Sequence, residues 1–171
     1  MDLSKVRTGI EQKLYELTSE IVSGQGYELY DVEYISGSST LRVFIMNSDT
    51  KTAIIEDCIK VDRAFSPYCE TEDWIPGDFV LEVSSPGVYR SLKTLKHFED
   101  SVGDYVLLTL NKALDEDIKA KLPRKFKNEK KIRVFLNSIK NNELNIDFEG
   151  VEFNLSFNDL KKASLDPDLK G

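Results

Sequence analysis

The chain has 171 residues, enough for one large domain or two small ones, and 40% of them are hydrophobic, too many for a disordered protein. Its formal net charge is −7. No apolar run approaches the roughly 18 residues of a membrane span, and the first residues lack the apolar core of a signal peptide. With only two cysteines, the composition predicts a cytoplasmic protein in a reducing compartment.

The charge is unevenly distributed along the chain. Residues 1–90 hold 8 Lys and Arg against 16 Asp and Glu, whereas residues 91–171 hold 15 against 14. An acidic first half repels phosphate at long range and attracts basic surfaces, or it merely keeps the protein soluble. Both interpretations remain open from the sequence.

The first half begins with patterns typical of a helix and a hairpin. Apolar residues recur every three or four positions over residues 6–21, which predicts a helix that ends near Gly24. Apolar residues then alternate over 30–34 and 41–45, with the turn 37–39 between them. This spacing predicts two antiparallel strands.

A second helix and a third strand follow. Helical spacing predicts a helix over residues 55–68, with Ile54 extending its apolar row and Pro67 bending or stopping it. The turn 75–78 leads into a β-type run at 79–83. The sequence thus predicts an α/β domain over residues 1–90, with two or three helices on a three-stranded sheet.

The character of the sequence changes near Gly103, and the second half is dominated by short strands. A short helix is predicted at residues 94–99. Polar turns separate the predicted strands, which cover residues 105–110, 132–139, 144–148 and 151–157. Short strands with such turns predict a small antiparallel β-barrel over residues 91–171.

The turn after the third strand is the first candidate site. Its hydroxyls and amides, together with a nearby arginine, could converge on one phosphate, because such groups form a concave donor set. The residues concerned are Ser84, Ser85, Gly87 and Arg90. The alternative is structural, with the two serines satisfying local backbone groups and the arginine pairing with an acid.

A basic segment between residues 119 and 133 is the second candidate. Eight cations and a single acid, Glu129, predict a salt-sensitive contact with an RNA backbone. The alternative is a solvated, mobile loop. The eight cations are Lys119, Lys121, Arg124, Lys125, Lys127, Lys130, Lys131 and Arg133.

An acidic set around the only tryptophan is the third candidate. Glu70, Glu72 and Asp73 could dock a basic protein, with Trp74 as an anchoring side chain. The alternative is that Trp74 packs beneath its loop and the acids are simply solvated. The same alternative applies to Asp78.

An enzymatic function is not expected. His97 is the only histidine, and Cys58 and Cys69 lack the spacing of a zinc-binding pair. No phosphate-binding loop, nucleophile elbow or metalloprotease motif is present. No metal or cofactor is therefore predicted.

Several motifs in consistent order resemble the RimP ribosome maturation factor family. The segment FVLEVSSPGVYRSL (79–92) carries its EVSSPG signature, and YELYDVEY (27–34) is similar to its first strand. Glu56-Asp57-Cys58, Ile75-Pro76-Gly77 and His97-Phe98 extend the likeness. After the turn, the family's usual L-D-R-P-L is VYRSL here, which keeps only the arginine and the final leucine.

The resemblance implies a fold and a function. Members of the family have an N-terminal α/β domain and a C-terminal barrel similar to SH3 or Sm domains, and they assist late maturation of the free small ribosomal subunit without catalysis or a cofactor. We therefore expect a monomer that contacts ribosomal RNA and a basic ribosomal protein. The alternatives are a general RNA-binding module and a protein-binding adaptor.

Overall fold

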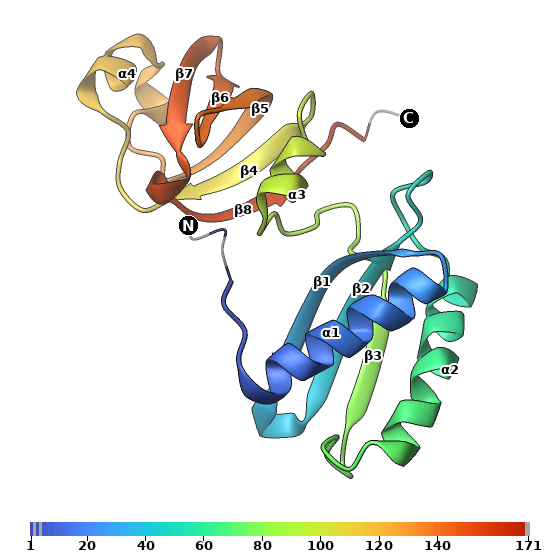
Figure 1. The fold of residues 1–171 in the computed structure, drawn as a ribbon. Helices are drawn as coiled ribbons and strands as arrows, with labels where there is room; N and C mark the ends of the chain where they lie inside the picture. The colour runs from blue at the N-terminus through green and yellow to red at the C-terminus, as the bar shows by residue number, and fades with distance from the viewer. Residues whose placement is uncertain (2, 4, 170–171) are drawn as a thin grey trace. The chain divides into compact units, whose positions relative to one another are not determined.

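The computed structural model describes residues 1, 3 and 5–169 and divides into two compact units. The first unit covers Val6–Gly87 (Figure 1). The second begins at Val88 and includes the first few residues of the chain. Within the described residues, no helix has the length and apolar character that crossing a membrane requires.

The first unit contains a three-stranded sheet and two helices. The strands occur in the spatial order β1-β2-β3; β1 and β2 are antiparallel, and β3 runs parallel to β2. In chain order the elements are α1 (Gly9–Gly24), β1 (Glu28–Ile35), a 3₁₀ turn (Ser36–Ser38), β2 (Thr40–Met46), α2 (Ile55–Thr71) and β3 (Val80–Ser84). The predicted hairpin and both predicted helices are thereby confirmed.

Both helices cover one face of this sheet. α1 packs on β1, α2 packs on β3, and the two helices contact each other (Figure 1). The alternating residues of β2 supply the centre of the core because their side chains share one face. The fully buried apolar residues here are Leu14, Val22, Leu41, Val43, Ile45, Val61 and Phe65.

Three details of the predicted helices are wrong. Val6 precedes α1 and is 83% exposed, and Ile54 is the exposed N-cap residue of α2 and not part of its apolar row. The Asp57 carboxylate accepts a hydrogen bond from the Ile54 N–H at 3.1 Å, which fixes the start of α2. The helix continues past Pro67 to Thr71, so the proline does not stop it and α2 ends three residues beyond the predicted Tyr68.

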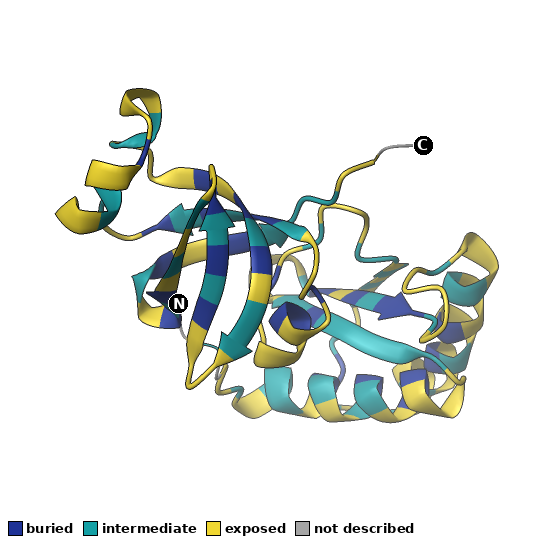
Figure 2. Cartoon of the chain, turned by 90° about the horizontal axis from the view of Figure 1, so that it is seen from above, coloured by how far each residue is buried: buried dark blue, intermediate teal, exposed yellow. Residues whose placement is uncertain are grey.

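The second unit contains one antiparallel sheet with the strand order β7-β6-β5-β4-β8. Buried residues alternate with more exposed ones along β4, β6 and the first half of β5 (Figure 2). The elements are α3 (Leu95–Glu99), β4 (Tyr105–Leu110), α4 (Glu116–Lys121), a 3₁₀ turn (Arg124–Phe126), β5 (Lys131–Lys140), β6 (Glu143–Phe148), β7 (Val151–Ser156), a 3₁₀ turn (Phe157–Asp159) and β8 (Leu160–Leu165). The protein is therefore a mixed α+β protein, as the sequence predicts.

The structure confirms all four predicted strands of this unit and adds one strand and one α-helix that the sequence does not predict. The sequence pattern does not predict β8 because its buried residues, Leu160 and Ala163, are three positions apart. Its pairing with β4 shifts register between Thr109 and Leu110, which breaks the two-residue period. The sequence pattern does not predict α4 because this helix is only six residues long and has no buried residue.

Candidate functional site

The turn that follows β3 is held together by hydroxyl groups. Ser84 is exposed at the end of β3, and the Ser85 hydroxyl lies 3.1 Å from the hydroxyl of Thr52. The Gly87 N–H donates to the same Ser85 oxygen at 3.4 Å. Gly87 adopts φ +80°, a conformation in which a side chain is strained. These contacts favour a structural role for Ser85.

Arg90 belongs to the second unit, where its backbone is part of the sheet edge. Its carbonyl accepts a hydrogen bond from the Leu165 N–H at 2.9 Å. Two residues later, the Leu92 N–H donates to the Ala163 carbonyl at 2.9 Å, and the Leu92 side chain is buried. The predicted anion site therefore draws its residues from both units, and neither unit contains all of them.

The basic segment contains the end of α4 and a 3₁₀ turn, and two of its eight cations are already paired. Lys119 forms an ion pair with Glu116 at 2.7 Å on α4. Arg133 on β5 pairs with Asp166 at 3.0 Å and with Asp168 at 2.6 Å. These two cations are less available to a phosphate than the sequence alone suggests.

The other six cations form what we call the cationic segment. Among the residues that the structure describes, none of the six has a carboxylate within ion-pair distance. Within this stretch, the Phe126 ring packs against the core of the second unit. The centres of the Phe126 and Phe148 rings are 5.3 Å apart. Five of the six side chains are exposed, and Lys127 is half-buried. The members are Lys121, Arg124, Lys125, Lys127, Lys130 and Lys131.

The acidic set is split between structural and available side chains. Trp74 packs against the core of the first unit, and its indole N–H donates to the Glu72 carboxylate at 2.7 Å. The ammonium of Lys13 lies 5.5 Å from the Trp74 ring centre. Glu70 and Asp73 are exposed, and neither has an ion pair among the described residues. Glu72 and Trp74 thus contact each other within their loop, while Glu70 and Asp73 are exposed to solvent.

The side chains that could act in catalysis, His97 and the two cysteines, lie in surroundings that make them unreactive. His97 is buried, and its Nδ1 accepts a hydrogen bond from the Lys93 N–H at 3.0 Å. Burial raises the pKa of the Cys58 thiol, with a further contribution from the Asp57 charge, and burial likewise raises the pKa of Cys69. Both thiols are therefore poor nucleophiles at neutral pH. Within residues 1, 3 and 5–169, no cluster of His, Cys, Asp and Glu could hold a metal ion.

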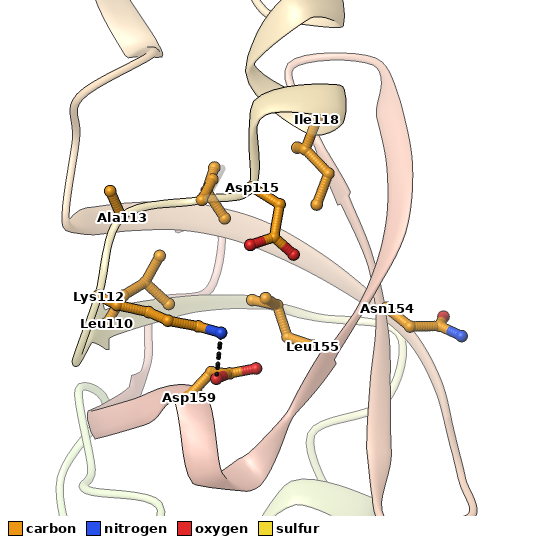
Figure 3. A pocket seen from close by; sticks show the side chains of 9 residues that line it. Leu110, Lys112, Ala113, Asp115, Ile118, Asn154, Leu155 and Asp159 are labelled. Carbon is orange, nitrogen blue, oxygen red and sulfur yellow. Dashed lines mark ion pairs between the residues drawn. The ribbon is translucent and has the colours of Figure 1, made fainter.

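A small cavity lies beside α4 in the second unit (Figure 3). Its volume is about 40 Å³, far below the several hundred Å³ of a typical ligand pocket. The Lys112 ammonium reaches across it to the Asp159 carboxylate at 3.3 Å. This cavity is too small for a substrate or cofactor.

Comparison with known families identifies the first unit. Residues 17–89 match the family described as the RimP N-terminal domain. Residues 17–89 form a RimP N-terminal domain, and this match supports the RimP family for the chain. The RimP family is a family of ribosome maturation factors, so the match points to ribosome maturation. The matched residues include the hydroxyl-rich turn and the acidic set, whereas the cationic segment lies outside the match.

Proposed function

We propose that this RimP-family protein is a non-enzymatic assembly factor that binds the free small ribosomal subunit transiently during its maturation. The observation that carries this proposal is the family match, which spans nearly the whole first unit from Leu17 to Tyr89. The proposal includes a cytoplasmic location, a monomeric state and the absence of a cofactor. The buried, hydrogen-bonded His97 and the raised pKa values of both thiols support a function without catalysis.

Two surfaces of opposite charge suit such a partner. In the second unit, the cationic segment would contact ribosomal RNA phosphates, a contact that weakens steeply as salt rises. In the first unit, exposed Glu70 and Asp73 would face a basic ribosomal protein. Arg90 and the hydroxyl-rich turn remain candidate contacts, with Ser84 the hydroxyl least engaged in the fold.

The mechanism we propose is a shift in population. A protein that binds one subunit conformation more tightly than another favours the first in proportion to its differential affinity. Contacts made only to an immature conformation would stabilise that assembly intermediate. Their loss in the mature subunit would then release the factor. No chemical step is required.

Co-sedimentation tests this function. The purified protein should migrate with free small subunits at low salt and be absent from whole ribosomes. Binding to neither particle would refute the proposal, and equal binding to both would favour a general RNA-binding module. That second candidate is supported by the six cations without ion pairs. A third, the protein-binding adaptor, predicts an association that survives nuclease treatment and responds little to salt.

A further inference from the structure

The outer face of strands β5, β6 and β7 carries a ladder of carboxamides. Asn137 Nδ2 donates to Asn145 Oδ1 at 3.1 Å, and Asn145 Nδ2 donates to Asn154 Oδ1 at 2.9 Å. The last amide, Asn154 Nδ2, donates to Glu143 Oε2 at 3.4 Å. Leu155, the next residue of β7, is buried, and Figure 3 shows Asn154 pointing away from it. The ladder therefore faces solvent.

A cavity of about 220 Å³ opens on this ladder. The strand register places Asn145 directly opposite both Ser138 and Asn154, so three polar side chains cross the sheet in one row. The complete lining is Ser138, Lys140, Glu143, Asn145, Glu152 and Asn154. A typical small-molecule site is larger and mostly apolar. This one is small and polar, which suits a single planar group with hydrogen-bonding edges.

The ladder leaves hydrogen-bonding capacity for such a ligand. A carboxamide offers two N–H donors and two acceptor lone pairs, and the ladder uses one donor of each asparagine. Glu152 has no hydrogen bond or ion pair among the described residues, so both of its oxygens can accept. The cavity thus presents free amide donors and acceptors beside carboxylates that only accept.

We propose that this cavity binds one unpaired RNA base that carries an exocyclic amino group. Asparagine forms paired hydrogen bonds with adenine edges, and carboxylates accept from the amino group of cytosine. Uracil has no amino group, so its single ring N–H is the only donor that it offers to the carboxylates of Glu143 and Glu152. Proteins commonly read RNA sequence from unstacked, single-stranded bases, which a shallow cavity on a sheet can receive.

The charges around the cavity fix the direction of binding. The carboxylates of Glu143 and Glu152 repel a phosphate, so the base enters and the backbone stays at the edge of the cavity. Lys140, which has no carboxylate within ion-pair distance among the described residues, supplies a cation at that edge. The cationic segment lies toward the other end of β5, where Lys131 is the first residue and Lys140 the last. At a strand rise of ~3.3 Å per residue, the two ends of β5 are at most about 30 Å apart.

This inference deepens the proposed function and rests on its RNA contact. The cationic segment would bind phosphates of any sequence, whereas the carboxamide ladder would add a preference for particular bases. The ladder would then select where on an immature subunit a single-stranded segment is held.

Anisotropy of labelled eight-nucleotide RNAs tests the site. At low salt the full chain should bind oligo-A and oligo-C about fivefold or more tighter than oligo-U, the lower end for one good base contact. Asn145→Ala and Asn154→Ala should remove most of that preference and leave oligo-U binding unchanged. Asn128→Ala, which deletes an exposed carboxamide elsewhere, is the matched control and should keep the preference.

A second variant controls for the possibility that the asparagine variants lose the base preference by misfolding. Glu152→Gln keeps the shape of an exposed side chain and should weaken the preference for cytosine with an unchanged melting temperature. Equal affinity for the three RNAs, or a preference that survives both asparagine variants, would overturn the base site. If affinity is then equal but still falls with salt and subunit binding persists, the proposed function stands and only the base site fails. Shifts of the Asn145 amide resonances on adding a peptide but not oligo-A would assign the cavity to a protein and also overturn it.

Discussion

Arg133 lies over the ring of Tyr105, with its guanidinium carbon 3.9 Å from the ring centre. The same guanidinium holds Asp166 and Asp168, which follow β8. Arg133 thereby joins β4, β5 and the segment after β8. A cation that the sequence groups with its basic neighbours is, in the fold, a structural residue.

The variant Arg133→Gln should therefore affect stability and leave RNA binding largely unchanged. Because the side chain is 38% exposed, we expect a loss of about 1 kcal/mol or less in unfolding free energy. Residues 166–169 should be digested faster by carboxypeptidase. The salt dependence of small-subunit binding should match that of the wild type, and a clearly flatter dependence would restore Arg133 to the RNA-binding surface.

Neutralising four members of the cationic segment should have the opposite effect. The combined change of Lys125, Lys127, Lys130 and Lys131 to Gln should weaken small-subunit binding and flatten its salt dependence. Each lost phosphate contact removes about 0.7–0.9 from the slope of log affinity against log salt concentration. An unchanged slope would exclude the segment from the interface.

A pairwise comparison controls for net charge. Lys161 and Lys162 on β8 are also exposed, and changing both to Gln removes the same charge as changing Lys130 and Lys131. Only the change of Lys130 and Lys131 should alter the dependence of small-subunit binding on salt concentration. Equal effects of the two pairs would mean that overall charge, and not a defined surface, governs binding.

Reversing Glu70 and Asp73 to Lys tests the acidic docking surface. These substitutions avoid Glu72, whose reversal would also break its hydrogen bond with Trp74. We expect weaker binding to small subunits with unchanged tryptophan fluorescence, because the indole keeps its surroundings. Glu16 and Glu20 are exposed on α1, and their reversal to Lys is the matched control. Binding as tight as that of the wild type would exclude this surface.

The Asp57 carboxylate should make stability depend on pH. The hydrogen bond from the Tyr27 hydroxyl lowers its pKa below the ordinary value, helped by the Ile54 N–H and then by the Lys60 charge. The fold thus favours the charged form, so the contribution is fully present above the ordinary aspartate pKa and is lost as pH falls through the lowered one. Asp57→Asn should destabilise the protein at neutral pH and cost progressively less in acid.

Urea unfolding of both proteins over a series of acidic pH values measures this effect. Asp62→Asn, a change at an exposed position on the same helix, should show no such convergence with the wild type. A deficit of Asp57→Asn that stays constant down to strongly acidic pH would contradict the assignment.

The hydroxyl pair that closes the β3 turn should be worth a measurable amount of stability. Ser85→Ala and Thr52→Ala should each lower the unfolding free energy by about 1 kcal/mol, the usual contribution of one hydrogen bond. Because the two hydroxyls contact each other at 3.1 Å, the double variant should cost less than the sum of the single variants. Strict additivity would show that the contact contributes nothing.

The sequence by itself determined the fold class, most of the secondary structure and the family. Period-two alternation located β1 and β2, because each of these strands has one face on a core, and polar turns delimited β4, β5, β6 and β7. Helical spacing located α1 and α2 for the same reason. The sequence was also sufficient to locate the turn after β3, because the proline and glycine there must end the strand.

The tertiary structure decided which charged and polar side chains are available. Arg133 meets Asp166 and Asp168 only because β4 lies between β5 and β8 in the sheet, a neighbourhood that no local pattern encodes. Asn145 and Asn154 line one cavity only because the register of β6 and β7 places them opposite each other. Side-chain periodicity reports which face of a strand is buried, whereas ion pairs and sites depend on which strands lie side by side in the folded sheet.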